Sequence, residues 1–253
     1  MTTVPVIGDQ EMRFEELLAS KGACYEARQW VGNKTIEQAW AECERADWMM
    51  WLLGKMAGHP GWPTRQQVAM MAADCAETSL GFVPDGEHRP KQAILATRKW
   101  ALGEDISPAH LREAAYAAGD AYADVAVDAA DIIASRKWGN EENISSAHLC
   151  DAATHAAVSA AYAVDTAAYA ADAADYAAYA AYVAAASAAD AYAADVADAA
   201  YVADYDADYA AFAAAFAEAK TKKLRELAEL IRPRFSPISE TLGLERGANW
   251  TWA

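Results

Sequence analysis

The stretch YAVDTAAYAADAADYAAYAAYVAAA, residues 162–186, decides the fold class. Alanine is the best helix former, and neither Gly nor Pro interrupts the chain between Gly139 and Pro233. One straight helix of that length would measure roughly 135 Å at about 1.5 Å per residue, which is too long for a chain of 253 residues. We therefore expect a long helical hairpin rich in Ala, Asp and Tyr. Its preferred break is SAAD (187–190), and the other candidate is DYDAD (204–208).

Aromatic residues follow helical spacing through the same part of the chain. Steps of seven relate one set and steps of three or four relate another, so each set lies on one helical face. The two sets are Tyr162, Tyr169 and Tyr176, and Tyr201, Tyr205, Tyr209, Phe212 and Phe216. Such stripes are more often core than a platform for ligands. We expect the alanines to allow close helix packing and the aromatic rings to supply the large buried area.

The other segments also carry helix signals. Thr35 and Thr64 each precede a Gln by three residues, which is the spacing of a capping box. Pro90 lies near an expected helix start, and Ser107 precedes Pro108 as an N-cap before a first-turn proline. The segment ADWMMWLLGKM (46–56) is apolar almost all round and is expected in the core. Because no segment alternates as a β-strand does, we predict an all-α fold of stacked antiparallel helices.

A duplication precedes the alanine-rich stretch. RKWALGEDISPAHL (98–111) returns 38 positions later as RKWGNEENISSAHL (136–149), with nine identities in fourteen residues. We expect each RKW segment to end a helix, with Trp100 and Trp138 packed inward. Ser107 and Ser145 are then the N-caps of the helices that follow.

Composition divides the chain into three parts, which we expect to form one compact unit. Residues 1–88 are a Trp-rich helical part, residues 89–235 an Ala-rich helical repeat part, and residues 236–253 a C-terminal tail.

The four cysteines are far apart and form no CxxC pair. We therefore expect reduced thiols, and we expect Cys24, Cys43 and Cys75 to behave as small hydrophobes within helices. The sequence shows no signal peptide and no stretch apolar enough to span a bilayer. These features predict a cytoplasmic protein.

The net charge of −16 is concentrated in one part of the chain. Residues 138–219 contain thirteen acidic residues and neither Lys nor Arg. Such a field repels nucleic acid and acidic membranes, and it attracts basic partners. We expect a protein partner that is basic or binds nucleic acid, and no direct binding of nucleic acid. A homo-oligomer is also compatible with the sequence.

Two stretches resemble known proteins. ACYEARQWVGNKTIEQAWAECERADWMMWLL (23–53) resembles the opening of alanine-rich helical proteins of phages and prophages. AADCAETSLGFVPDGEHRPKQAILATRKWALGE (72–104) resembles bacterial proteins classed as immunity proteins. The resemblance covers roughly residues 20–135. It implies an all-helical, non-catalytic protein that neutralises a toxin or a host defence factor, in the host cytoplasm if a phage encodes it.

The acidic residues give the first candidate site, a partner-binding face. The distances between Asp residues along a helix are similar to the distances between phosphates along DNA. An array of carboxylates could therefore imitate a DNA duplex. The alternative is that these side chains only keep an alanine-rich surface soluble. The proposed face consists of Asp165, Asp172, Asp195, Asp198, Asp204 and Asp208.

A different class of function is a sponge that holds a nucleotide signal in a Trp- and Tyr-lined pocket. To hold a nucleotide, a protein that is acidic overall needs a local cluster of Lys and Arg side chains. The candidate ligand-binding cations are Arg98, Lys99, Arg136 and Lys137.

His148, Asp151 and His155 share one helical face and are weak metal-ligand candidates. The di-iron bundles place Glu before His, which is the reverse order, so we expect first-turn structural residues and no metal or other cofactor. No nucleophile motif or phosphate-binding glycine loop is present. We therefore predict no enzyme. The function we expect is a phage or bacterial immunity or anti-defence protein that acts by binding.

Overall fold

The computed structural model describes residues 13–135, 155, 158–160, 162–163, 165–166, 174–203, 209–235 and 237. Every regular element in these residues is helical, which confirms the all-α prediction. The α-helices are α1 (Phe14–Ser20), α2 (Tyr25–Val31), α3 (Ile36–Glu42), α4 (Ala46–Met56), α5 (Arg65–Glu77), α6 (Arg89–Ala101), α7 (Pro108–Ser135), α9 (Ala174–Ala203) and α10 (Tyr209–Ile231). Two short 3₁₀ helices are η1 (Leu80–Phe82) and η3 (Arg232–Arg234). In these ranges no helix is both long and apolar enough to cross a membrane.

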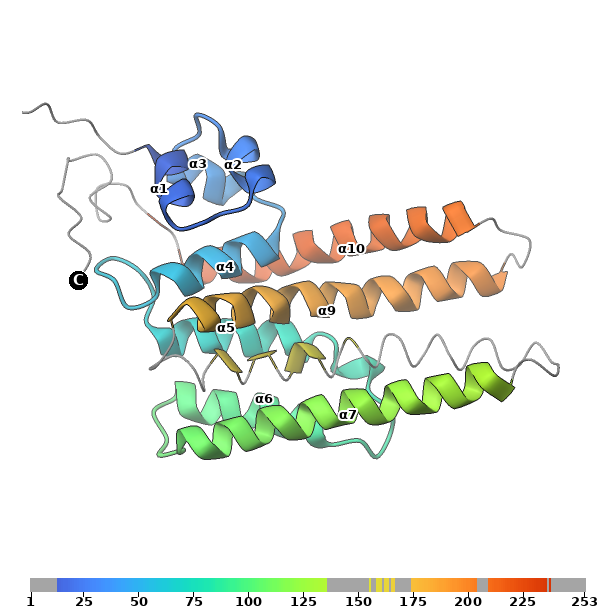
Figure 1. Ribbon diagram of the computed structural model, residues 1–253. Helices are drawn as coiled ribbons and strands as arrows, with labels where there is room; N and C mark the ends of the chain where they lie inside the picture. Colours follow the sequence, from blue (N-terminus) through green and yellow to red (C-terminus); the bar gives the residue numbers. More distant parts are fainter. Residues whose placement is uncertain are drawn as a thin grey trace, which may run out of the picture.

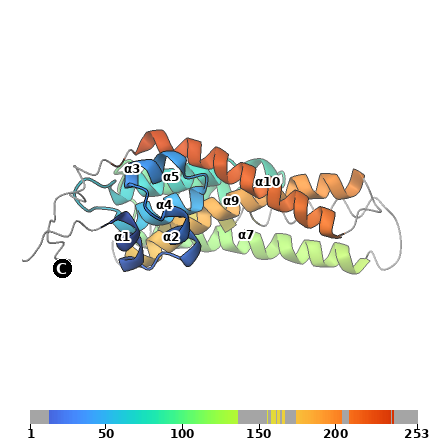
Figure 2. The ribbon, with the colours of Figure 1, turned by 90° about the horizontal axis from the view of Figure 1, so that it is seen from above.

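The helices stack in layers around α9. This helix packs against α4, α5 and α10, while α6 packs between α5 and α7. Figure 1 shows the long helices α7, α9 and α10 with roughly aligned axes, α10 running back along α9, and α4, α5 and α6 gathered at one end. Seen from above in Figure 2, the three short helices α1, α2 and α3 cover α4 at that same end. The molecule is therefore elongated, with a thick end and a thin end.

Local sequence signals place several helix starts as expected. The side chain of Thr35 accepts a hydrogen bond from the backbone N–H of Gln38, and that of Thr64 accepts from the N–H of Gln67. Both complete a capping box, because each Gln side chain also accepts from the threonine N–H. Ser107 caps α7 by accepting from the N–H of His110 at 3.2 Å. These contacts depend only on neighbours three residues away.

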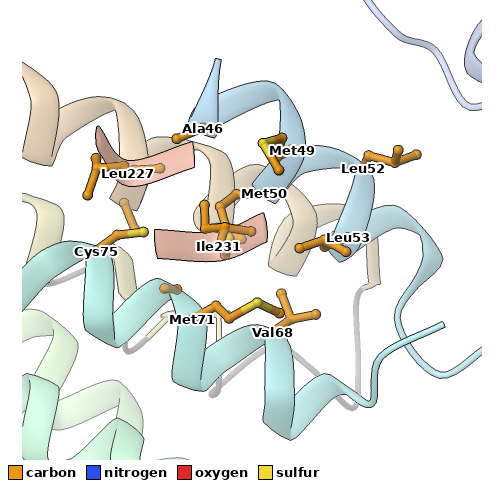
Figure 3. Packing of buried hydrophobic residues seen from close by; sticks show 14 of the residues in the cluster. Ala46, Met49, Met50, Leu52, Leu53, Val68, Met71, Cys75, Leu227 and Ile231 are labelled. Atoms are coloured by element: carbon orange, nitrogen blue, oxygen red, sulfur yellow. The ribbon is translucent and has the colours of Figure 1, made fainter. Parts of the chain in front are cut away.

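The thick end contains the large side chains of the core. Met50 and Leu53 of α4 meet Val68 and Met71 of α5 and Ile231 of α10 (Figure 3). This confirms that the segment 46–56 belongs to the core. One cluster of buried side chains extends from α1 to α10, so the Trp-rich part and the Ala-rich part share it.

In the described residues the centre of the stack is made of alanine, as the expected close packing of helices requires, while the expectation that the aromatic stripes supply the large buried area stays a prediction. The buried alanines of α9 are Ala180, Ala181, Ala184, Ala185, Ala188, Ala189, Ala191, Ala193 and Ala194. The neighbouring Tyr179 is 52% exposed, and Tyr162 and Phe216 of the two aromatic stripes are only half-buried. The remaining members of those stripes lie outside the described side chains. Small side chains let neighbouring helices approach closely, and the larger rings are then excluded to the flanks of the contact.

The preferred break in the alanine-rich stretch was wrong. Helix α9 continues through Ser187 and Asp190 without interruption. Ser187 is buried, and Asp190 forms an ion pair of 2.5 Å with Lys220 of α10, so neither residue is free to end the helix. The hairpin instead separates α9 from α10 at residues 204–208, the other candidate, which lie outside the described residues.

The first copy of the duplication has the expected structure. Arg98 and Lys99 lie in the last turn of α6, and Trp100 is half-buried against the core. Residues 136–149, which form the second copy, lie outside the described part of the chain. Structural equivalence of the two copies therefore stays a prediction.

The guanidinium group of Arg232 in η3 binds the backbone at the C-terminal end of α3. Arg232 donates from Nε to the carbonyl oxygen of Trp40 at 3.2 Å and from Nη2 to that of Cys43 at 2.8 Å. The last carbonyls of a helix have no partner within the helix, so an arginine is well suited to satisfy them. Arg232 also pairs with Glu229.

Replacing this arginine should weaken the fold. We expect Arg232→Ala to lower the free energy of unfolding by about 2 kcal/mol, because two carbonyl groups lose a charged donor. Urea denaturation followed by far-UV circular dichroism measures the effect. The matched control is Arg225→Ala, which removes the exposed ion pair with Glu44 and should change little. Equal losses in the two variants would contradict the role of Arg232.

Candidate functional site

A pocket opens between the four N-terminal helices and α9. Its volume is about 280 Å³. We call it the tryptophan pocket, and its walls are Phe14, Leu18, Gly22, Ala23, Cys24, Ala27, Trp30, Val31, Ala39, Trp40, Cys43, Trp48, Met49, Trp51, Leu52, Tyr179 and Tyr182. An apolar cavity of about 150 Å³ is large enough to bind benzene. The tryptophan pocket therefore has room for a bicyclic ring.

The pocket exists because α4 has two apolar faces. Residues three or four positions apart share a face of a helix. Trp48, Trp51 and Leu52 follow that spacing and line the pocket. Met50 and Leu53 follow it on the opposite side, where they face the core. The short helices α1, α2 and α3 then close over the tryptophan face.

Cations hold two of the rings in place. Trp30 and Trp48 pack against each other with 6.2 Å between ring centroids. Lys34 lies 4.4 Å from the centroid of the Trp30 ring, and the guanidinium of Arg45 lies 4.4 Å from that of Trp48. Each contact is within the range of a cation–π attraction. These contacts restrict the orientations of the Trp30 and Trp48 rings.

An ion pair between the partly exposed Arg45 and the buried Asp47 anchors the start of α4 beside Trp48. Arg45 donates from Nε and Nη2 to the two carboxylate oxygens of Asp47 at 2.9 and 2.6 Å. Asp47 is almost completely buried. Burial raises the pKa of the nearby Tyr182 phenol, and the Asp47 carboxylate raises it further. Tyr182 is therefore a neutral hydroxyl in the wall at ordinary pH.

One buried donor in the wall has no hydrogen-bond partner among the described residues. The indole Nε1–H of Trp40 is buried and meets no hydrogen-bond acceptor among the described residues. Trp40 itself is only 5% exposed. A buried N–H without an acceptor is unfavourable, and such a group calls for a specific explanation. The Nε1 atom has less than 1 Å² of accessible surface, so an occupant of the pocket does not reach it.

The two thiols of the wall differ in environment. Cys43 is buried and donates a weak hydrogen bond to the carbonyl oxygen of Arg45 at 3.5 Å. Burial raises the pKa of the Cys43 thiol to about 11, so it is a poor nucleophile. Cys24, which we expected inside a helix as a small hydrophobe, is instead the exposed N-cap residue of α2. The expectation failed because Cys24 precedes the helix and its side chain faces solvent.

The acidic residues predicted as a partner-binding face lie mainly outside the described side chains. Asp165 and Asp195 are half-exposed. Asp198 belongs to α9, but its side chain is not among those described. Asp172, Asp204 and Asp208 lie outside the described residues.

Of the basic residues predicted as a ligand site, the two that the structure describes, Arg98 and Lys99, do not line the tryptophan pocket. Arg98 donates to Asp74 at 2.6 Å and to Glu77 at 2.6 Å, so acids of α5 already balance its charge. Lys99 is exposed. Arg136 and Lys137 lie outside the described residues.

The metal candidates are only partly described. His155 is half-buried, and His148 and Asp151 lie outside the described residues. Within the described part of the chain, no group of three or more His, Cys, Asp or Glu side chains is placed to hold a metal ion.

The sequence contains one signal that relates to the pocket, a second apolar face on α4. Trp48 and Trp51 lie three residues apart, on a face separate from that of Met50 and Leu53. A helix that is apolar on two faces must be covered on both. That pattern predicts a second layer over α4, although not a space within it.

No family model, curated protein or solved structure matches the chain. The resemblance to phage and immunity proteins therefore stays a prediction.

Proposed function

We propose that the protein is a non-enzymatic binding protein that holds a bicyclic aromatic group in the tryptophan pocket. The observation that carries this proposal is an apolar space of about 280 Å³ whose described walls are mainly aromatic and aliphatic side chains. Such pockets typically combine apolar walls with a few polar groups that orient the ligand. The ligand class is a planar, mainly apolar two-ring compound.

The chemistry of the wall favours binding over reaction. Its polar groups are indole, phenol and thiol, and the Cys43 thiol is held in its protonated form. The rings of Trp30 and Trp48 are fixed by the contacts of Lys34 and Arg45, which reduces the entropy lost on binding. A two-ring ligand that gains about 0.5 kcal/mol per non-hydrogen atom would bind with a dissociation constant of about 0.1 mM.

The biological role that we propose follows from the sequence resemblance. A phage or bacterial immunity or anti-defence protein could act by sequestering an aromatic signal in the pocket. The acidic face of Asp165, Asp172, Asp195, Asp198, Asp204 and Asp208 supports a second mechanism, capture of a basic or nucleic-acid-binding protein. We place the pocket first because the described residues line a space of defined volume, about 280 Å³, whereas most of the acidic face lies outside the described side chains.

Filling the pocket should abolish ligand binding. Ala23 lines the pocket from the loop between α1 and α2. We expect Ala23→Phe to weaken binding of coumarin, a two-ring lactone, at least tenfold, because the added ring occupies the space. Isothermal titration calorimetry measures the affinity. The control is Ala19→Phe, since Ala19 is exposed on α1 and is not part of the wall. If the wild-type protein does not bind coumarin, or if Ala23→Phe binds coumarin as well as Ala19→Phe does, the proposed function is wrong.

A further inference from the structure

The three short helices α1, α2 and α3 lie together on the outer side of α4 (Figure 1). Within the described chain, extensive helix-to-helix contacts join α4, α5, α6, α7, α9 and α10 into one stack and join α1 to α2. None of these extensive contacts joins α1, α2 or α3 to that stack. We call residues 13–42 the lid, because they cover the tryptophan pocket, and residues 43–45 link the lid to α4.

The tryptophan pocket separates much of the lid from the stack. Phe14, Leu18, Val31 and Trp40 are buried apolar side chains of the lid, and each of them lines the pocket. They therefore border a space of about 280 Å³ in addition to neighbouring side chains. Atoms beside a space lose the dispersion contacts that a packed neighbour supplies. The lid is therefore held less tightly than the core face of α4.

Side-chain contacts tie the lid to the stack beside the pocket. Trp30 packs against Trp48 of α4 with 6.2 Å between ring centroids, and Trp40 packs edge-to-face on Phe235 at 5.6 Å. Arg232 donates to the carbonyl oxygen of Trp40 at 3.2 Å. Each lid helix has seven residues, and helices shorter than about 12 residues are at best marginally stable in water on their own. If these contacts break, the three helices therefore lose their structure together.

We propose that the lid unfolds as one unit and opens the tryptophan pocket while α4–α10 stay folded, and that a bound aromatic ligand holds the lid closed. The lid supplies Phe14, Leu18, Trp30 and Trp40 to the wall, so the wall is complete only when the lid is folded. Elements that cover ligand sites are drawn from the least stable parts of proteins. The second half of this inference rests on the proposed function, because it concerns the ligand of that site.

Amide hydrogen exchange, followed by mass spectrometry of peptides, tests the lid without any ligand. In the wild-type protein the amides of α1, α2 and α3 should exchange at least about tenfold faster than the slowest amides of α9. Urea below the unfolding transition should accelerate exchange in α9 more steeply than in the lid, because global unfolding exposes more surface than lid opening does. Equal rates and equal urea dependence in the two parts would overturn the inference.

Two buried leucines provide a matched pair of variants. Leu17 of the lid is 2% exposed and Leu53 of α4 is 0% exposed, and neither belongs to the described pocket wall. Leu17→Ala should accelerate exchange in the lid at least about tenfold, because the truncation destabilises the lid itself. Leu53→Ala should accelerate the slowest amides of α9 at least about tenfold and leave exchange in the lid unchanged, because Leu53 stays packed when the lid opens.

Equal acceleration of the lid and of α9 by Leu53→Ala would overturn the inference, because the lid would then unfold only with the rest of the chain. If either variant fails to fold, the urea series on the wild-type protein decides the question.

Coumarin tests the link between the lid and the ligand. At about ten times its dissociation constant, coumarin should slow exchange in the lid about elevenfold, because only molecules with a folded lid bind it. Coumarin that binds in calorimetry without slowing this exchange would overturn the link, while the proposed function would stand. If the wild-type protein does not bind coumarin, the proposed function fails, and the urea series and the leucine pair alone decide whether the lid opens as a unit.

Discussion

Leu53→Ala is expected to lower the free energy of unfolding by about 3–4 kcal/mol. Leu53 is 0% exposed in the centre of the contact between α4, α5 and α10. Truncating a fully buried leucine removes apolar contacts and leaves a cavity that the surrounding helices fill only in part. Urea denaturation, with α-helical circular dichroism as the signal, gives the value directly.

The chain contains a matched control for this substitution. Leu95 is also in the middle of a helix, α6, but it is 47% exposed. Leu95→Ala changes the same atoms and, if anything, improves helix propensity. We expect a change of less than about 0.5 kcal/mol, as for most surface substitutions. A loss in Leu53→Ala no larger than that in Leu95→Ala would mean that the α4 contact is not the core of the fold.

The second large effect is a loss of stability at alkaline pH. Cys75 of α5 is completely buried, and burial raises the pKa of its thiol from 9.0 to about 12. Below pH 9 the thiol is protonated in both the folded and the unfolded chain, so the full stability is present. As the pH rises above that value the unfolded chain loses this proton while the folded chain keeps it, which favours unfolding. Each pH unit in this window costs about 1.4 kcal/mol, or about 3 kcal/mol between pH ~9 and ~11.

Cys43 adds a similar contribution, because burial raises the pKa of its thiol to about 11. The variant Cys75→Ala isolates the larger share. It should be less stable than the wild-type protein at neutral pH, because a core atom is missing, and this difference should shrink by about 3 kcal/mol at pH ~11. Urea denaturation across this pH range in the presence of a reducing agent measures both curves. The exposed Cys24 provides the control, since Cys24→Ala should keep the wild-type pH dependence. Parallel curves for Cys75→Ala and the wild-type protein would refute the assignment.

The features that the sequence predicted correctly are local. The capping boxes at Thr35 and Thr64 and the cap at Ser107 each involve groups three residues apart, so their geometry follows once a helix begins. The helical character of the alanine-rich stretch is local for the same reason, because it expresses the propensity of each residue. The core position of 46–56 followed from a segment too apolar to remain in water.

The place of the hairpin was decided by contacts between distant residues. Ser187 and Asp190 favour a helix end when considered alone. In the folded chain Ser187 is buried and Asp190 is paired with Lys220, and these contacts outweigh a preference worth less than about 1 kcal/mol.

The candidate site also combines features that the sequence predicts with features that depend on contacts between distant residues. The tryptophans of α2, α3 and α4 and their spacing are written in the sequence, and so is the second apolar face of α4. The volume they enclose depends on the three short helices and on Tyr179 and Tyr182 of α9, which are far away along the chain. Whether apolar side chains interdigitate completely or leave a space of about 280 Å³ is decided by the distances between helices. The sequence by itself therefore determined the helices, their caps and their apolar faces, because these depend on near neighbours. Only the tertiary structure decided which alanines of α9 are buried between helices, where the hairpin turns and where a pocket remains. Packing is a property of surfaces that meet after the chain has folded.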